Sequence, residues 1–173
     1  MPHEVSTGTL TVERLRWLLD YDPETGIFRW KNRDNRPDFI GRVAGCVSRL
    51  HGYRVIRIDG FLYKAGRLAW LYCTGQWPSQ LIDHADGRRD NDAFANLREA
   101  SSHQNCSNKA YVSSISGFKG VFWNARRQRF VARITVNRKS VYLGTFKCPR
   151  EAASAYNVGA VLLVGKFARI NQI

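Results

Sequence analysis

The sequence lacks the long apolar runs and the paired cysteines that mark several classes of protein. No stretch of its 173 residues approaches the roughly 18 apolar residues of a membrane span. Met1–Leu10 carries no basic-then-apolar secretory pattern. The four cysteines are scattered without a Cys-x-x-Cys pair, so we expect reduced, mostly buried thiols and no disulfide scaffold or zinc ribbon. These absences argue against a membrane-spanning or secreted protein.

Acidic residues are almost missing from the last third of the chain. Residues 109–173 hold 12 Lys and Arg but one acid, Glu151, whereas residues 1–108 hold 15 Lys and Arg against 13 acids. A folded segment with such an excess repels itself unless a polyanion neutralises it, which suggests nucleic acid or an anionic membrane surface as the partner. A membrane surface would favour a basic amphipathic helix. Most of these cations lie in the stretch of residues 118–146, which reads as strands joined by turns, and this favours nucleic acid.

Hydrophobic periodicity predicts an α+β protein in two parts. In the first part, Thr11 caps a short helix, residues 27–31 form a strand, and residues 41–63 form a small antiparallel meander. The second part is predicted to contain three strands and then a helix, over residues 118–123, 129–136, 140–146 and 149–164. The helix must pack across one face of that three-stranded antiparallel sheet to bury a core. The other face is then free, and it carries much of the charge.

A short and unusually polar segment, residues 81–108, follows the meander. Its pattern predicts a strand, a loop rich in Asp, Arg and Asn, and a returning strand. Ser101 and Gln104 match a capping box, so we expect a helix to start at Ser102. Asn105 and Asn108 then share one face of that helix, three residues apart.

This polar segment carries acidic, histidine and asparagine residues at a characteristic spacing: Asp83-His84-Ala85-Asp86-Gly87, Asn91, Asn96-Leu97-Arg98 and Asn105. The pattern resembles the HNH nuclease family, whose ββα-metal unit would correspond to residues 81–108. The resemblance implies His84 as general base and Asp83 and Asn105 as metal ligands. It also implies that Asn96 orients His84 or pins the loop, and that Arg98 contacts phosphate.

The chemistry of phosphodiester hydrolysis explains these residue types. It needs a nucleophilic water, stabilisation of a pentavalent phosphorus centre and help for the departing alkoxide. An imidazole can take a proton from water at neutral pH. A divalent cation on carboxylate and amide oxygens can neutralise the phosphate and the leaving oxygen. Two protein ligands leave positions for water and DNA oxygens, which suits one Mg²⁺ or Mn²⁺.

Some residues of this region have a simpler interpretation. An Asp-His pair on its own is more often a surface turn, and Asp86 and Asp90 are interpreted as loop-shaping residues.

Similar sequences usually place a histidine where this chain has Gly66, which offers no side chain to metal or DNA. Drift at a dispensable position and a deliberate replacement that weakens cleavage both explain Gly66. If that histidine assists catalysis, this chain binds DNA but cuts it slowly.

The basic part carries a second set of motifs: Gly117-Phe118-Lys119-Gly120-Val121, Val141-Tyr142-Leu143-Gly144-Thr145-Phe146, Glu151-Ala152-Ala153-Ser154-Ala155-Tyr156-Asn157 and Asn171. They resemble the Apetala-type DNA-binding domain of plant ethylene-response factors. Such domains lay a three-stranded sheet in the major groove. The positions that would face DNA are Lys119, Trp123, Arg127, Arg129, Arg133 and Tyr142. Because Phe122 and Arg133 depart from the common pattern, the base preference of that family does not carry over.

The sequence thus predicts a two-domain DNA endonuclease, with an HNH nuclease domain over residues 1–108, a linker over 109–116 and an Apetala-type domain over 117–173. The resemblance suggests a free-standing homing endonuclease of phage type that leaves 5′-phosphate and 3′-hydroxyl ends. Its expected partner is double-stranded DNA, with no membrane. We expect a monomer in the cytoplasm of a bacterial or phage-infected cell. The alternative is a non-catalytic DNA-binding regulator with a decayed nuclease unit.

Overall fold

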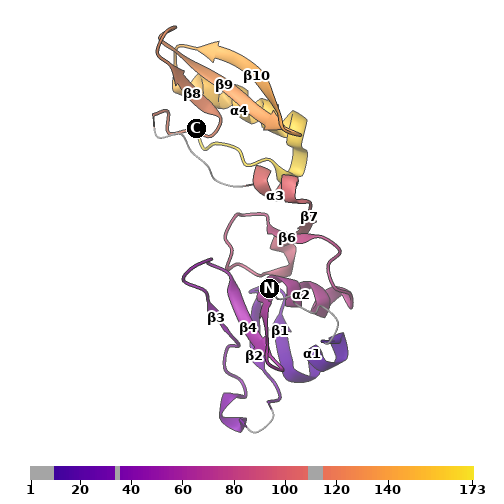
Figure 1. Ribbon diagram of the computed structural model, residues 1–173. Helices are drawn as coiled ribbons and strands as arrows, with labels where there is room; N and C mark the ends of the chain where they lie inside the picture. Colours follow the sequence, from indigo (N-terminus) through magenta and orange to yellow (C-terminus); the bar gives the residue numbers. More distant parts are fainter. Residues whose placement is uncertain (1–9, 34–35, 109–114) are drawn as a thin grey trace, which may run out of the picture. The chain divides into compact units, whose positions relative to one another are not determined.

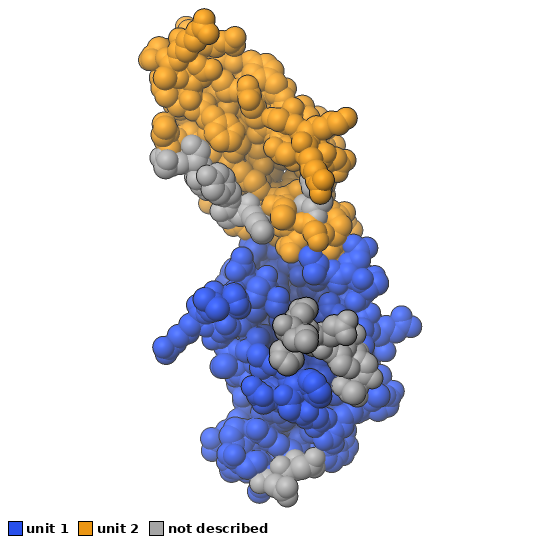
Figure 2. All heavy atoms as spheres, viewed as in Figure 1, with its two compact units in different colours: residues 1–99 blue, residues 100–173 orange. Residues whose placement is uncertain are grey.

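The computed structural model describes residues 10–33, 36–108 and 115–173 and divides the chain into two units. Unit 1 is Met1–Glu99 and unit 2 is Ala100–Ile173, and Figure 2 colours them separately. Each unit contains its own cluster of buried hydrophobic residues. Most of the predicted linker, residues 109–114, lies outside the described residues.

Unit 1 combines short helices with small sheets (Figure 1). Strands β1 and β2 form an antiparallel hairpin, β3, β4 and β5 form the predicted antiparallel meander, and β6 pairs with β7. The elements are α1 (Val12–Leu18), β1 (Leu19–Asp22), β2 (Ile27–Trp30), η1 (Pro37–Phe39), β3 (Cys46–Val47), β4 (Arg54–Ile58), β5 (Phe61–Lys64), α2 (Ala65–Thr74), β6 (Leu81–His84), η2 (Phe94–Asn96) and β7 (Leu97–Ala100), whose last residue lies in unit 2.

Capping and turn residues fix the ends of several elements in unit 1. The hydroxyl of Thr11 accepts a hydrogen bond from the backbone amide of Arg14 at 3.2 Å and begins α1, as the sequence predicts. Gly75 ends α2 in the left-handed conformation, with φ of 76°. Gly26 closes the β1–β2 hairpin with φ of 73°, and a Cβ there would collide with the backbone of Asp92. Glycine therefore lets the hairpin approach the loop between β6 and β7.

The hydrophobic cluster of unit 1 joins these elements into one core. Leu15 from α1, Phe28 from β2, Ile56 from β4 and Leu68 from α2 are all fully buried in it. Because each comes from a different element, burying them together fixes the hairpin, the meander and α2 relative to one another. This core supports the β6–β7 segment, whose Leu97 is also part of it.

Unit 2 contains a three-stranded antiparallel sheet with strand order β10-β9-β8 and one long helix, α4. Figure 1 shows α4 running across one face of this sheet. The elements are α3 (Ser102–Ser107), β8 (Val121–Asn124), β9 (Arg129–Val136), β10 (Lys139–Phe146), α4 (Pro149–Val164) and η3 (Gly165–Phe167).

Small residues allow α4 to lie close to the sheet. Ala152 and Ala153 pack against Val121 and Ala132 with none of their surface exposed. A Cβ at Gly120 would overlap the ring of Tyr156, and the φ of 71° at Gly120 also favours glycine. This close packing buries the core that the sequence predicts for the sheet and helix.

The observed architecture confirms the predicted α+β class, with the sheet and helix in the C-terminal part. Two expectations differ from the structure. Residues 68–72, whose sequence indicates only an apolar and aromatic patch, are part of a helix, α2. The cysteines are free, as expected, but Cys46, Cys73 and Cys106 are exposed, so the prediction of mostly buried thiols is wrong. No helix among the described residues is long and apolar enough to cross a membrane.

Candidate active site and nucleic-acid interface

A buried carboxylate–imidazole pair lies at the end of β6. His84, the last residue of the strand, is 6% exposed, and its Nε2 is 3.0 Å from Oδ1 of Asp92, which is 2% exposed. A carboxylate only accepts hydrogen bonds, so Nε2 of His84 donates to Asp92. The sequence predicted His84 as a site residue but did not single out Asp92.

Asn96 pins the loop between His84 and β7. Its amide oxygen accepts from the backbone amide of Asp86 at 3.0 Å, and its Nδ2 donates to Oδ1 of Asp86 and to the carbonyl of Asn91 at 3.0 and 2.8 Å. Asn91 donates in turn to Oδ2 of Asp86 at 2.7 Å. Although partial burial raises the pKa of Asp86, hydrogen bonds from Asn91, Arg88 and Asn96 lower it overall. Of the two predicted roles of Asn96, its side chain therefore performs loop pinning, and Asp86 shapes the loop as expected.

Asp83, the predicted metal ligand, forms an ion pair with Arg98 on β7. The Nε and Nη2 of Arg98 both donate to Oδ2 of Asp83, at 2.9 and 2.8 Å. Asp83 is 4% exposed, so this pair is largely shielded from water. Arg98, predicted as a phosphate contact, thus holds in place the carboxylate of Asp83, the residue that precedes His84 in β6.

Asn105, the second predicted metal ligand, lies on α3 in unit 2. The predicted capping box is present: Ser101 accepts from the backbone amide of Gln104 at 3.3 Å, and Gln104 accepts from the backbone amide of Ser101 at 2.8 Å. The helix therefore begins where the sequence predicts. The convergence of Asn105 with Asp83 stays a prediction.

The metal-ligand set that the sequence predicts is small. Within the described ranges, no three His, Cys, Asp or Glu side chains gather as a candidate metal site. The predicted set draws only one carboxylate, from Asp83, and one amide, from Asn105. Hard oxygens of this kind match the preference of Mg²⁺ or Mn²⁺, and the fixed carboxylate of Asp83 fits such an ion.

Gly66, in the first turn of α2, faces the carboxylate–imidazole pair. A Cβ at this position would lie 3.0 Å from Oδ1 of Asp92, 3.5 Å from Leu97 and 3.6 Å from Cε1 of His84. The first of these distances is too short for a comfortable contact, so the absence of a side chain makes room for Asp92. This packing adds a third explanation of Gly66 to the drift and the deliberate weakening that the sequence left open.

Two cations that the sequence analysis did not select, Lys64 and Arg89, lie against the ring of Tyr53, which is beside His84. The rings of Tyr53 and His84 are 5.8 Å apart, and Nζ of Lys64 and the guanidinium of Arg89 lie 4.2 and 5.3 Å from the Tyr53 ring. Burial lowers the pKa of Lys64, as do the nearby charges of Arg67 and Arg89. Among the described residues, no acidic side chain forms an ion pair with Lys64, Arg67 or Arg89. Lys64 and Arg89 come from separate parts of the chain, so no local motif indicates them.

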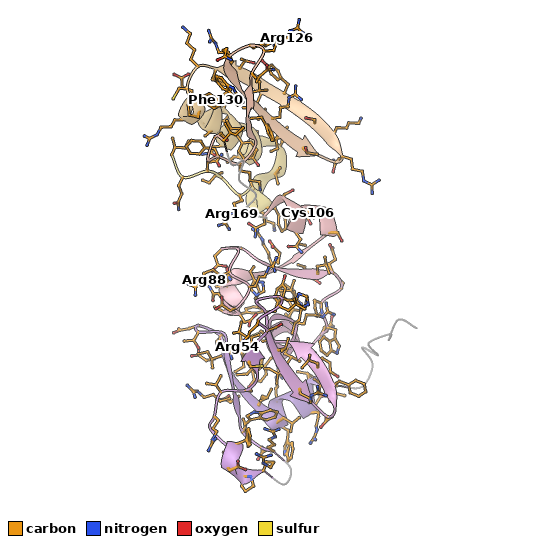
Figure 3. All side chains as sticks on the ribbon, turned by 60° about the vertical axis from the view of Figure 1, so that its left-hand side comes forward. Arg54, Arg88, Cys106, Arg126, Phe130 and Arg169 are labelled. Atoms are coloured by element: carbon orange, nitrogen blue, oxygen red, sulfur yellow. The ribbon has the colours of Figure 1, made fainter. Side chains whose placement is uncertain are left out.

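The face of the unit 2 sheet away from α4 carries exposed cationic and aromatic side chains. Arg133 pairs with Tyr142 in the β9–β10 register, and both are exposed on this face. Arg129 lies on the same side of β9, four residues earlier. Arg127 is exposed in the β8–β9 turn, and its neighbour Arg126 projects from that end of the sheet in Figure 3.

Two predicted DNA contacts are instead engaged within unit 2. Nζ of Lys119 donates to the carbonyl of Ser107, at the end of α3, at 2.6 Å, and burial, with the nearby charge of Arg169, lowers its pKa. Trp123 pairs with Phe130 across β8 and β9, on the side of the sheet that α4 covers, and their rings are 4.8 Å apart. Lys119 and Trp123 are therefore less available to DNA than Arg133 and Tyr142.

Comparison with known proteins agrees with this division of the chain. Residues 63–106 match the family model described as HNH endonuclease. The chain is also 31% identical, over 156 residues, to the protein named Uncharacterized HNH endonuclease L560 of Acanthamoeba polyphaga mimivirus; the match covers 90% of this chain and 73% of that protein. The chain belongs to the HNH endonuclease family. The matched residues contain Asp83, His84, Gly66, Asn96 and Asn105.

The basic part of this HNH endonuclease family member matches a second family. Residues 116–159 fit the model described as AP2 domain, which confirms the Apetala-type resemblance. The chain is similar to Protein 3.8 of Escherichia phage T7, with 38% identity over 82 residues, 44% of this chain and 68% of that protein. Both matched domains indicate DNA binding, and the family supports a nuclease.

Proposed function

We propose that this protein is a metal-dependent DNA endonuclease in which His84 is the general base. The observation that carries the proposal is the buried His84–Asp92 pair, in which His84 directly follows Asp83 along β6. The family membership supports phosphodiester hydrolysis in particular. His84 takes a proton from the attacking water at Nδ1, because Nε2 is committed to Asp92.

One divalent cation, Mg²⁺ or Mn²⁺, completes the proposed site and neutralises charge on the phosphate and the leaving oxygen when bound. Asp83 and Asn105 would hold it through one carboxylate and one amide oxygen. Arg98 keeps the Asp83 carboxylate in position through its two hydrogen bonds to Oδ2. Asn96 holds the loop that follows His84, so that the imidazole stays at the end of β6.

DNA is held by cationic surfaces on both units. On unit 2, Arg127, Arg129, Arg133 and Tyr142 are the proposed contacts, since a guanidinium can bind guanine or phosphate. On unit 1 we add the cluster around Tyr53, because Lys64 lies near the cations Arg67 and Arg89 and a phosphate would supply the missing negative charge. If roughly six to eight phosphates are neutralised, log K falls with log salt at a slope of about −5 to −7.

A nicking assay on supercoiled plasmid tests the catalytic proposal. We expect wild type to nick DNA with Mg²⁺ or Mn²⁺, and His84→Ala to be at least about 100-fold slower, since a positioned general base contributes about 10²–10⁴-fold. His51→Ala is the matched control, because that side chain is exposed and outside the site. Equal rates for wild type and His84→Ala would refute His84 as the general base.

The second candidate is a DNA-binding regulator without catalysis. The ion pair that Arg98 makes with Asp83 favours it, because it occupies one oxygen of the proposed metal ligand. Retained DNA binding with no nicking by any variant, at any concentration of either metal, would establish the regulator.

Under the favoured proposal the protein is a free-standing homing endonuclease that acts as a monomer in the cytoplasm of a bacterial or phage-infected cell.

A further inference from the structure

We propose that Asp92 is a positioning residue that fixes the orientation and tautomer of His84; this inference rests on the proposed nuclease function. The two side chains are joined by the 3.0 Å contact between Oδ1 of Asp92 and Nε2 of His84. Both are more than nine-tenths buried, so water competes little for either partner. The carboxylate also stabilises the positive ring that forms when His84 accepts a proton.

The backbone around Asp92 is held by an element distant in sequence. The hydroxyl of Tyr21 donates to the carbonyl of Asp92 at 2.8 Å, across 71 positions of the chain. Burial raises the pKa of Tyr21, so this hydroxyl keeps its proton and remains a donor. Two residues beyond Asp92, the amide of Phe94 donates to the carbonyl of Pro23 at 2.9 Å. The β1–β2 hairpin therefore fixes Asp92, and Asp92 in turn fixes His84.

The second carboxylate oxygen of Asp92 makes this arrangement unfavourable for the stability of the fold. Oδ2 is buried and has no hydrogen-bond partner among the described residues. A buried carboxylate with an unsatisfied oxygen destabilises a fold, and an amide or an apolar side chain of similar size would avoid much of that cost. A role in structure alone therefore does not account for an acid at this position. A negative charge that accepts from Nε2 and stabilises the protonated ring does account for it.

The kinetic test compares Asp92→Asn with Asp90→Asn in the nicking assay. Asp90 is an exposed acid in the same loop, so it provides the matched control. An asparagine amide can turn either its oxygen or its NH₂ toward Nε2 and carries no charge. We expect kcat to fall about 100-fold for Asp92→Asn, with KM within about twofold and the melting temperature equal or higher. Asp90→Asn keeps the wild-type kcat.

Repeating the assay over a range of Mg²⁺ concentrations separates positioning from metal binding. Under the proposal, the rate of Asp92→Asn stays low at every concentration. Recovery of the wild-type rate at high Mg²⁺ would overturn the proposal, because Asp92 would then act on the metal site. If Asp92→Asn had the same kcat as wild type at the ordinary Mg²⁺ concentration, the proposal would be overturned as well. The nuclease proposal would stand in either case, as long as wild type cleaves DNA.

Nitrogen NMR of the His84 ring tests the pairing without any cleavage. We expect wild type to show the neutral ring with its proton on Nε2, and Asp92→Ala to lose this preference while its fold, followed by circular dichroism, is retained. The His84→Ala spectrum assigns the signal. A proton on Nδ1 in wild type, or the same tautomer in wild type and Asp92→Ala, would overturn the proposal even if the protein cuts DNA.

Discussion

Replacing Gly66 by alanine tests whether that position makes room for the carboxylate–imidazole pair. The added methyl would lie 3.0 Å from Oδ1 of Asp92, so the carboxylate must move by a few tenths of an ångström. Such a shift takes the 3.0 Å contact with His84 to about 3.3 Å or more, beyond the ordinary range for this hydrogen bond. A helix such as α2 otherwise favours alanine over glycine. Two opposing effects therefore decide whether Gly66→Ala lowers or raises the free energy of unfolding.

The magnitudes favour a net loss of stability. Weakening a hydrogen bond to a charged group costs about 1.5–3 kcal/mol, whereas replacing glycine by alanine inside a helix gains about 0.5–1 kcal/mol. The free energy of unfolding should therefore fall by about 1–2 kcal/mol in a urea titration, and the nicking rate should fall by about tenfold or more. Gly66→His adds the same Cβ, so it should lower the rate and not restore a stronger nuclease.

A double-mutant cycle shows whether the effect passes through Asp92. In an Asp92→Ala background the 3.0 Å contact is gone, and the remaining contacts, with Leu97 and His84, are at ordinary van der Waals distances. Gly66→Ala should then raise the free energy of unfolding by about 0.5–1 kcal/mol. The same destabilisation in both backgrounds, or a faster nuclease from Gly66→Ala or Gly66→His, would refute the reasoning.

Three further predictions concern the loop and the DNA-binding surfaces. Asn96→Ala removes three side-chain hydrogen bonds within the loop and should lower the free energy of unfolding by about 2–4 kcal/mol in urea denaturation; a loss below about 0.5 kcal/mol would contradict loop pinning. Arg133→Ala should make the slope of log K against log salt for DNA binding less steep by about one, measured by fluorescence titration. An unchanged slope and affinity would show that Arg133 does not contact DNA. Lys64→Gln should raise KM several-fold with kcat within about threefold, and unchanged KM would exclude a phosphate contact.

Local patterns in the sequence predicted much of the fold because the residues that decide it are neighbours in the chain. The capping box of Ser101 and Gln104 marks the start of α3. The spacing of Ala153, Tyr156, Ala160 and Leu163 predicts the buried side of α4, which is correct except for Leu163, which is 45% exposed. The strand, loop, strand and helix around His84 follow from the same kind of signal. Helix α2 was missed because its run of apolar and aromatic residues has too little polar contrast to show a helical period.

The predicted site lacked the residues that come together only in the folded chain. Asp92 contacts His84 because the β1–β2 hairpin, about seventy positions earlier, holds its backbone. Tyr53 lies against the ring of His84 and Lys64 lies against the ring of Tyr53, and nothing in the spacing of Lys64 marks it. In the basic domain, sheet register decides which residues face away from α4, so Trp123, selected by resemblance, lies on the α4 side of the sheet.

The most direct test of the central claim is Mn²⁺ binding, followed by electron paramagnetic resonance, because it reports on both proposed ligands at once. Wild type should bind one Mn²⁺ per chain, and Asp83→Asn and Asn105→Ala should each weaken that binding at least about tenfold, while Asp90→Asn should not. Binding that is the same in Asn105→Ala as in wild type, or the absence of a bound Mn²⁺ in wild type, would contradict the convergence of Asp83 and Asn105 on one cation beside His84.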